Sequence, residues 1–351
     1  MPSKDGKVGF GIIGLNYGAA RCRMIQQLPD ARLVAVVART PEKAKQAATT
    51  LGVDWYTDYR ELLSRDDVDV VGIYIPSGRH EEIAIETARA GKHVLLTKPM
   101  EITLERCDAI IRACQAAKVK LATEFIFRYR PCNYRLYHSI KEGKFGRMIL
   151  GEFAFKCFRS QAYYESDAGW RGTWAVDGGG AIMNQTIHMV DQMLWMMGNP
   201  LTVVAHCGTF AHRIEAEDTG VALFTFEGGA FGILVGTTAF LNDRPVGAYG
   251  SDTRRIEIGG QSASATIQED KLVMWKAESS DAPLPEVPSP AANVFEDYVR
   301  WIRDDGYVSP TLVKPDQSRK AVELVLAIYE SARTGKSVRF PFSAKKVPDT
   351  F

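Results

Sequence analysis

A polar stripe on one very apolar segment is the chemical feature that stands out in this chain of 351 residues. Asn184, His188, Asp191 and Trp195 are spaced i, i+4, i+7 and i+11, so a helix over residues 181–197 would place them on one face. Histidine titrates close to neutral pH and therefore suits proton transfer. Asp191, one turn further along, is placed to orient the imidazole. The alternative is a hydrogen-bonded structural histidine on a half-exposed helix.

A lysine follows a short buried segment in the first third of the chain. Residues 93–96 are typical of a strand, and Thr97, Lys98 and Pro99 come directly after it. Ligands of open α/β sheets bind at the carboxyl ends of strands, so Lys98 is a candidate site residue. The competing interpretation is a solvated surface charge.

The first strand, residues 8–13, is followed at once by a glycine-containing loop and a helix. The loop has the pattern Gly14-x-Asn16-x-x-Ala19, which departs at its second position from the dinucleotide fingerprint GxGxxG or GxGxxA. Asparagine tolerates a positive φ, but its side chain narrows the space for a pyrophosphate. A pyrophosphate at this helix N-terminus would bind backbone N–H groups and the positive end of the helix dipole. An ordinary tight turn is the alternative.

The residues after the second strand, residues 33–37, indicate whether the site favours an adenosine ribose with a 2′-hydroxyl or with a 2′-phosphate. An acidic residue there would favour NAD, because it accepts a hydrogen bond from the ribose 2′-hydroxyl. The chain instead has Ala38, Arg39 and Thr40, which puts the Arg39 cation where a 2′-phosphate would lie. We therefore expect NADP(H) to be favoured over NAD(H). A merely solvated Arg39 would carry no such preference.

Aromatic and arginine side chains gather shortly before a glycine run at residues 178–180. Aromatic rings stack on sugar faces and arginines donate to hydroxyls or carboxylates, so this composition suits a carbohydrate. An aromatic packing surface is the alternative. The residues are Arg159, Tyr163, Tyr164, Trp170, Arg171 and Trp174, with Arg128 and Tyr129 near the expected domain junction.

The elements that must position these residues alternate between strands and helices up to about residue 125. Continuous apolar strands separated by amphipathic helices predict a parallel sheet covered on both faces. The handedness of the crossovers makes such a sheet doubly wound. Thr40 and Pro41 begin one of the helices, and Gly91 ends another. We therefore expect a first domain over residues 1–125.

The alternation of strands and helices ends at about residue 130. Period-two patterns joined by tight turns, such as the one at residues 227–229, predict a largely antiparallel sheet. The helix over residues 181–197 interrupts this sheet, and two further helices are expected at residues 294–304 and 316–334. The chain is thus expected to be α/β, with an N-terminal doubly wound parallel sheet and a C-terminal α+β domain. That second domain, residues 126–351, would have an open, largely antiparallel sheet.

Composition argues against several classes of partner. Lys and Arg number 43 and Asp and Glu 42, for a net charge of +1, which gives no electrostatic case for nucleic acid or an anionic membrane. The apolar runs are shorter than the roughly 20 residues that span a bilayer, and the polar start MPSKDGK is not typical of a signal peptide. The 6 cysteines include no CxxC pair, and no His/Cys cluster has metal-ligand spacing. We expect reduced thiols, a cytoplasmic protein and no metal.

Taken together, these motifs resemble the glucose–fructose oxidoreductase, inositol dehydrogenase and rhizopine-catabolism (Gfo/Idh/MocA) oxidoreductase family. The resemblance covers almost the whole chain. It rests on the loop at residues 11–19, on residues 69–80, 90–94 and 98–99, on Trp170 and Arg171, on the glycine run and the His188 helix, and on residues 327–332 and 335–338.

The resemblance implies an NAD(P)-binding Rossmann domain and a C-terminal domain whose open sheet often forms an oligomer interface, in a homodimer or homotetramer. It implies hydride transfer between nicotinamide and a secondary hydroxyl or ketone of a sugar, sugar derivative or cyclic polyol. His188 would be the general base, and Lys98 would hydrogen-bond the reacting oxygen and the nicotinamide ribose. Implied cofactor contacts are Gly14, Asn16, Tyr17, Ala38, Arg39, Pro76, His80, Thr97 and Lys98. Implied substrate contacts are Arg128, Tyr163, Trp170, Arg171, Asn184 and Asp191.

Three positions depart from the family pattern. Thr97 stands where the family has the glutamate of Glu-Lys-Pro, which removes a carboxylate that would stabilise the Lys98 ammonium. Asn184 stands where the family has an aspartate. An amide cannot relay a proton, so we expect Asn184 to bind or orient a substrate hydroxyl. Asn16 in the glycine loop is the third departure.

Two other functions remain open from the sequence alone. One is a glycosidase of the same fold that uses tightly held NAD to oxidise and re-reduce the sugar transiently. The other is a non-enzymatic regulator that senses a dinucleotide or a sugar. The presence of both Lys98 and His188 argues against the regulator, because a sensor has no need of a positioned base.

Overall fold

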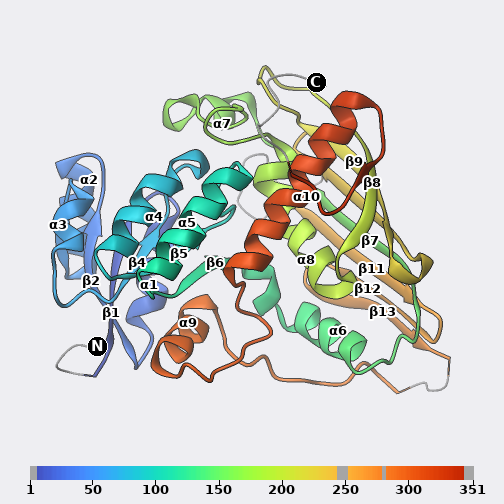
Figure 1. The fold of residues 1–351 in the computed structure, drawn as a ribbon, viewed down its shortest axis with the longest axis horizontal. Coiled ribbons are helices and arrows are strands. Elements are labelled where there is room, and N and C mark those ends of the chain that lie inside the picture. Colours follow the sequence, from blue (N-terminus) through green and yellow to red (C-terminus); the bar gives the residue numbers. More distant parts are fainter. Residues whose placement is uncertain (1–5, 243–251, 279–281, 344–351) are drawn as a thin grey trace. The chain divides into compact units, whose positions relative to one another are not determined.

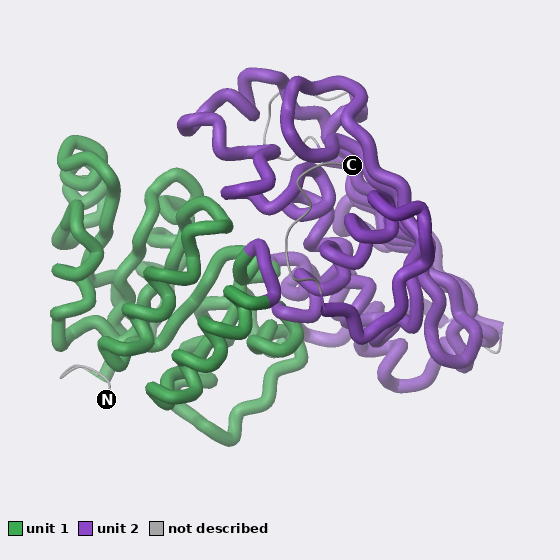
Figure 2. Tube along the Cα trace, turned by 45° about the horizontal axis from the view of Figure 1, so that its top comes forward, with its two compact units in different colours: residues 1–101, 105–125, 290–318 green, residues 102–104, 126–289, 319–351 purple. Residues whose placement is uncertain are grey.

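A computed structural model of the chain describes residues 6–242, 252–278 and 282–343. Residues 1–5, part of the polar start that argued against a signal peptide, lie outside these ranges. The chain divides into two compact units, which Figure 2 distinguishes by colour. Unit 1 comprises residues 1–101, 105–125 and 290–318, and unit 2 comprises residues 102–104, 126–289 and 319–351.

Unit 1 is built on a six-stranded parallel sheet with the order β3-β2-β1-β4-β5-β6. Its strands are β1 (Val8–Ile13), β2 (Ala31–Val37), β3 (Asp54–Tyr56), β4 (Val70–Ile73), β5 (His93–Thr97) and β6 (Leu121–Glu124). Every residue of β1 and β4 is buried, as expected of strands covered on both faces. The doubly wound sheet predicted from the sequence is confirmed, and its strand order reverses between β1 and β4.

Helices connect these strands and flank the sheet (Figure 1). They are α1 (Gly18–Gln26), α2 (Pro41–Leu51), α3 (Tyr59–Leu63), α4 (His80–Arg89), α5 (Leu104–Ala116) and α9 (Val294–Arg303). The predicted start of α2 is confirmed, since the Thr40 side chain accepts from the Lys43 backbone N–H and Pro41 is the first helical residue. The short elements β3 and α3 were not predicted, because three to five residues are too few for a clear period.

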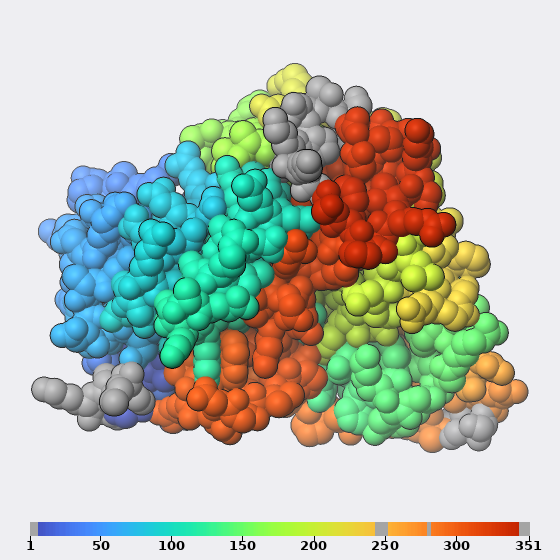
Figure 3. All heavy atoms as spheres, viewed as in Figure 1, coloured from blue at the N-terminus to red at the C-terminus, as the bar shows by residue number. Residues whose placement is uncertain are grey.

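A segment from the far end of the sequence completes unit 1. Phe295 of α9 packs edge-on against Phe10 of β1, with ring centroids 6.0 Å apart. The Tyr298 hydroxyl donates to the Val94 carbonyl oxygen at 2.8 Å. The orange spheres of this segment lie against the teal spheres of α5 in Figure 3. Contacts between residues about 200 positions apart have no local signal, so the expected division into two successive domains did not include residues 290–318 in the first.

Unit 2 contains an eight-stranded sheet with the order β13-β12-β11-β7-β10-β9-β8-β14. Its strands are β7 (Met148–Lys156), β8 (Pro200–Gly208), β9 (Thr219–Phe226), β10 (Phe231–Thr237), β11 (Thr253–Gly260), β12 (Ala263–Gln268), β13 (Lys271–Ala277) and β14 (Val338–Arg339). Strands β7 and β10 pair in parallel, and the other neighbours pair antiparallel. The largely antiparallel sheet predicted from the sequence is therefore confirmed.

The two faces of this sheet differ. The helices of unit 2 are α6 (Pro131–Lys141), α7 (Gln161–Glu165), α8 (Ile187–Met197) and α10 (Pro315–Thr334), of which residues 319–334 belong to this unit. Helices α8 and α10 lie over one face (Figure 1), where Phe153 and Phe224 are fully buried. The opposite face carries a row of exposed apolar side chains that includes Val204, Leu223 and Phe231. Such a row is typical of a surface that contacts another protein.

Candidate active site

The cofactor candidates of unit 1 lie at one edge of its sheet. Gly14 follows β1, Ala38 and Arg39 follow β2, Pro76 lies beyond β4, and Lys98 follows β5. Because the strands are parallel, their carboxyl ends meet at the same edge, where open α/β sheets bind ligands. The fold of unit 1 thus brings together residues that are spread over more than 80 positions of the sequence.

The turn from β1 into α1 requires a glycine. Gly14 has a φ of +91°, and a Cβ at this position would lie 2.2 Å from the Tyr74 carbonyl oxygen. Helix α1 then begins at Gly18, with no acidic residue in its first turn. A helix N-terminus without negative side chains suits the pyrophosphate of a dinucleotide. The residues present therefore fit this part of the cofactor.

Asn16, the departure within the glycine loop, is linked to the next helix. Its side chain is exposed, and its Oδ1 accepts a hydrogen bond from the Lys43 ammonium of α2. This contact brings a second cation close to the loop and to the turn that holds Arg39. The region around the expected adenosine ribose is therefore basic.

A buried carboxylate lies beside Thr97, the position at which the family pattern has a glutamate. Thr97 at the end of β5 is in register with Glu124 at the end of β6. Glu124 is 2% exposed and accepts from Arg21 Nε at 3.1 Å. Burial raises the pKa of Glu124, while Arg21 and the Lys98 ammonium both act to lower it. Sequence analysis missed Glu124, although its position at the end of a predicted strand was a usable signal.

Two other cofactor candidates are held by neighbouring groups. The Arg21 guanidinium carbon lies 3.7 Å from the centroid of the Tyr17 ring. His80 is fully buried, with Nδ1 3.0 Å from the Met100 carbonyl oxygen and Nε2 3.1 Å from the Ile75 carbonyl oxygen. Burial lowers the pKa of His80, which favours the neutral imidazole. A neutral imidazole has one N–H, so His80 donates to one of these two carbonyl oxygens while its ring packs between the chain after β5 and the chain after β4.

The helix predicted over residues 181–197 has two parts in unit 2. A π-helical turn spans Ile182–Thr186, and α8 follows directly. Local π-helical turns occur often at functional sites. His188 is the second residue of α8, and Asn184 lies in the π turn.

Glu217 anchors the start of this helix. Its carboxylate accepts from the backbone N–H groups of Gly180 at 3.0 Å and Ile182 at 2.7 Å, and its carbonyl oxygen accepts from the N–H of Ala181 at 3.0 Å. The Tyr329 hydroxyl donates to the same carboxylate at 2.9 Å. Burial raises the pKa of Glu217 to about 7, against the effect of these donors. The glycine run is needed here, because a Cβ on Gly180 would lie 1.8 Å from the Glu217 carbonyl oxygen.

An aromatic stack supports His188. The imidazole lies on the Phe127 ring with centroids 4.5 Å apart, and Phe127 stacks on Phe155 of β7 at 6.4 Å. His188 is 7% exposed, so its ring is oriented by packing on most sides. Phe127 and Phe155 were missed by sequence analysis, because contacts of this kind join residues about 30–60 positions apart without a local signal.

Asn184, the departure before the histidine, faces a carboxylate. Its Nδ2 donates to Asp177 Oδ1 at 2.9 Å and Oδ2 at 3.1 Å. Asp177 is 1% exposed, and its Oδ2 also accepts from the Gly172 backbone N–H at 2.9 Å. A buried carboxylate is therefore hydrogen-bonded directly to the side chain at position 184. Binding of a substrate hydroxyl by Asn184 stays a prediction.

Arg128 and Asp191 bind each other. Arg128 Nη2 donates to Asp191 Oδ1 at 2.6 Å, and Arg128 Nε donates to Oδ2 at 3.0 Å. Both residues are 1% exposed, and the guanidinium lies 5.2 Å from the Trp195 ring centroid. Burial raises the pKa of Asp191, whereas Arg128 acts to lower it. This placement favours a structural role for both residues over direct contact with a substrate.

Arg128→Met is expected to lower the free energy of unfolding by about 3–5 kcal/mol near pH 8, because it leaves the Asp191 carboxylate buried without its cation. Without the cation, burial is opposed only by the hydrogen bond from Gln192, so the folded-state pKa of Asp191 rises further. The folded state then binds a proton more tightly than the unfolded state, so the loss should shrink towards about pH 5. Urea unfolding at the two pH values measures both effects.

The double variant Arg128→Met with Asp191→Asn is the control. It removes the buried charge, so it should recover part of the lost stability and show no comparable pH dependence. Equal destabilisation of Arg128→Met at both pH values would contradict the assignment of the loss to the unpaired carboxylate.

The aromatic and arginine residues expected to contact a carbohydrate divide into core and surface residues. Tyr164 and Trp174 are buried, at 4% and 7% exposure, and therefore belong to the core. Tyr163 lies closer to the helix, since its hydroxyl accepts from Gln185 Nε2 at 3.1 Å. The Arg171 guanidinium lies 4.7 Å from the Tyr163 ring centroid and 4.9 Å from that of Trp170. Three of the predicted substrate contacts, Tyr163, Trp170 and Arg171, are thus brought together.

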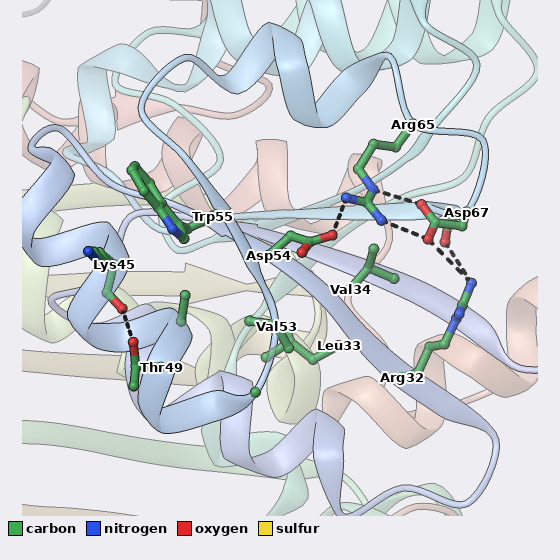
Figure 4. Close-up of a pocket in the computed structure, with 12 residues that line it drawn as sticks. Arg32, Leu33, Val34, Lys45, Thr49, Val53, Asp54, Trp55, Arg65 and Asp67 are labelled. Carbon is green, nitrogen blue, oxygen red and sulfur yellow. Dashed lines mark hydrogen bonds and ion pairs between the residues drawn. The ribbon is translucent and has the colours of Figure 1, made fainter.

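An open pocket of about 580 Å³ lies elsewhere in unit 1, beside β2 and β3 (Figure 4). Its walls include the exposed ring of Trp55 and the side chains of Arg32 and Arg65. Arg65 is bound by Asp54 at 2.5 Å and Asp67 at 2.8 Å, so its positive charge is neutralised within the pocket wall. None of the predicted site residues lines it.

Within the described ranges, no helix combines the length and apolar character needed to cross a membrane. In the same part of the chain, no three His, Cys, Asp or Glu residues are grouped so that they could hold a metal ion.

Comparison with known proteins places both units in one family. Residues 8–125 match the oxidoreductase family GFO_IDH_MocA, described as an NAD-binding Rossmann fold, and residues 135–266 match the GFO/IDH/MocA C-terminal domain.

Solved structures and curated proteins give similar relatives. The WlbA dehydrogenase from Bordetella pertussis, solved in complex with NADH and UDP-GlcNAcA, is 29% identical with a TM-score of 0.85, over 96% of this chain and 100% of that one. The aldose-aldose oxidoreductase from Caulobacter crescentus, complexed with glycerol, is 26% identical with a TM-score of 0.80, over 95% of this chain and 100% of that one. The myo-inositol 2-dehydrogenase of Thermotoga maritima is 27% identical over 275 residues, which is 76% of this chain and 77% of that protein.

Proposed function

The chain belongs to the Gfo/Idh/MocA oxidoreductase family, and we propose that it transfers a hydride between a nicotinamide dinucleotide and a secondary hydroxyl or ketone of a sugar, sugar derivative or cyclic polyol. One observation carries the proposal. The edge of unit 1 that holds the Gly14 loop also holds Lys98 at the end of β5, so a cofactor site and a candidate catalytic cation share one sheet edge. Relatives that are dehydrogenases of sugars and inositols support the substrate class.

A bound nicotinamide supplies the hydride acceptor or donor, and the chain's own residues handle the proton and the charge. We assign to His188 the removal of the hydroxyl proton during oxidation, with Phe127 holding its ring in place. We assign to Lys98 a hydrogen bond to the reacting oxygen, which favours its alkoxide character. Glu124 stabilises the Lys98 ammonium in the place of the carboxylate that Thr97 lacks.

The basic surroundings of the expected adenosine ribose support NADP(H) as the favoured cofactor. Arg39 follows β2, where the adenosine ribose binds in folds of this kind. Lys43, bound to Asn16, adds a second cation nearby. Arginine binds a phosphate with two parallel hydrogen bonds, so Arg39 is the residue that we expect to recognise the 2′-phosphate.

Titration of the purified protein with NADPH and with NADH tests the cofactor site and its preference together. We expect the wild type to bind NADPH more tightly than NADH. Arg39→Gln should weaken NADPH binding by about 10- to 100-fold, the change expected when one charged hydrogen bond is lost. NADH affinity should stay within about threefold, because NADH has no group for Arg39 to bind. Quenching of tryptophan emission and the nicotinamide fluorescence report the binding.

Arg89→Gln, which removes an exposed arginine of α4, is the matched control and should change neither affinity. Tighter binding of NADH by the wild type would refute the role of Arg39 while leaving the oxidoreductase assignment intact. A protein that is free of retained nucleotide and binds neither form would refute the proposed cofactor chemistry.

A further inference from the structure

One arginine of unit 2, Arg159, follows the strand that supports His188. Phe155 of β7 stacks on Phe127, which in turn contacts the His188 ring. Strand β7 ends at Lys156, and the chain beyond it is held to the segment after β10 by an isolated bridge between Phe158 and Ala239. The Arg159 backbone N–H also donates to the Thr238 carbonyl oxygen at 2.8 Å, so the backbone of Arg159 is fixed just beyond this strand.

Arg159 is also linked through one tyrosine to the helix that carries His188. Its guanidinium carbon lies 5.5 Å from the Tyr163 ring centroid. The Tyr163 hydroxyl in turn accepts a hydrogen bond from Gln185, which precedes His188 by less than one turn. The helix that carries His188 and the tyrosine beside Arg159 are thus in direct contact.

Within the described ranges, Arg159 has no acidic partner and its guanidinium donates only to the neighbouring Phe158 carbonyl oxygen, at 3.1 Å. A carboxylate binds each of three other arginines in this unit. Arg128 is bound by Asp191 at 2.6 Å, Arg171 by Asp167 at 3.1 Å, and Arg254 by Asp270 at 3.0 Å. A partly buried guanidinium that is left without a carboxylate is prepared to bind an anion from outside the chain.

We propose that Arg159 binds an anionic group of the substrate, so that the enzyme acts on acidic sugars, which carry a carboxylate or a phosphate. This rests on the proposed oxidoreductase function and narrows its substrate class. The Tyr163 ring contacts this guanidinium and also that of Arg171, so it helps to hold Arg159 in position beside the helix that carries His188. The planar guanidinium can donate two parallel hydrogen bonds to either anion, which fixes the orientation of the sugar.

Kinetics on matched neutral and acidic sugars test the proposal. The carboxylate arm compares glucuronate with glucose and UDP-glucuronate with UDP-glucose, and the phosphate arm compares glucose 6-phosphate with glucose. We expect the wild type to have a higher kcat/KM for the acidic member of at least one pair. Arg159→Gln should lower kcat/KM for that acidic sugar by about 10- to 100-fold and leave the neutral partner within about threefold.

Arg213→Gln is the control of matched chemistry, since the Arg213 side chain is 85% exposed and its nearest carboxylate oxygen, on Glu165, is 3.6 Å away. It should leave both members of each pair unchanged. A preference of the wild type for neutral sugars, or an equal loss on both members in Arg159→Gln, would overturn the proposal. The arm that shows the selective loss identifies the anion.

A binding measurement keeps the result decisive if none of these sugars is turned over. Thermal unfolding of the NADPH-loaded protein should then show stabilisation by an acidic sugar in the wild type and in Arg213→Gln, but not in Arg159→Gln. Cofactor binding without any such difference overturns the role of Arg159 and leaves the oxidoreductase function standing. Failure to bind any nicotinamide nucleotide overturns the oxidoreductase function instead, and the same unfolding comparison without nucleotide still decides whether Arg159 binds an anion.

Discussion

Replacing His188 with asparagine will lower kcat by about 10²- to 10⁴-fold, the range expected when a general base is removed. Asparagine retains hydrogen-bonding capacity and fits the space on the Phe127 ring, but it cannot accept a proton near neutral pH. Nicotinamide affinity should be unchanged, because the cofactor candidates belong to unit 1 and His188 to unit 2. Steady-state kinetics on the best substrate of the sugar screen, together with a cofactor titration, measure both quantities.

The pH profile and chemical rescue separate loss of a base from loss of structure. In the oxidation direction a general base acts in its unprotonated form, so the wild-type rate should rise with pH, and this limb should be absent from His188→Asn. Added imidazole should restore part of the rate only if a base is missing. His206→Asn, on the exposed face of β8, is the matched control. A rate in His188→Asn within about threefold of the wild type would show that His188 is not the base.

Lys98→Met is the second change with a large expected effect, a loss of about 10²- to 10³-fold in kcat through the missing donor to the developing alkoxide. Methionine keeps the length and the apolar stem of the side chain but removes the ammonium. Binding of the reduced cofactor should weaken much less than kcat falls, because the glycine loop and the Arg39 turn remain. Rates of hydride transfer under single-turnover conditions separate the chemical step from product release.

The same variant tests the link between Lys98 and Glu124. The Lys98 ammonium helps to keep the pKa of the buried Glu124 from rising further. Its removal should therefore favour the protonated form of that carboxyl, which infrared difference spectra detect. Lys118→Met, an exposed lysine before β6, is the control. Unchanged kcat in Lys98→Met would refute the assigned role, whatever the state of Glu124.

The departures from the family pattern illustrate how tertiary structure changes the meaning of a motif. From the sequence, Thr97 and Asn184 each remove a carboxylate beside a candidate catalytic residue. The structure supplies one carboxylate near each position, Glu124 in register with Thr97 and Asp177 hydrogen-bonded to Asn184. Both are 2% exposed or less, so they act in surroundings where charge interactions are strong.

The sequence by itself determined the class of the fold and the candidates for chemistry. Strand and helix periods, the Thr40 cap and the Gly14 loop are local signals, and each depends on residues within one or two turns of the chain. The residue types of Lys98 and His188 and their place after a strand and on a helix are local as well. These features therefore emerged without knowledge of any long-range contact.

Only the tertiary structure decided which groups meet. The return of residues 290–318 to unit 1, the Phe127 support of His188 and the Arg128–Asp191 pair all join residues more than 60 positions apart. The structure also separated Arg128, which has a carboxylate, from Arg159, which has none among the described residues. Packing across the fold determines which group pairs with a charged side chain. Sequence spacing predicts such pairs only within a few helical turns.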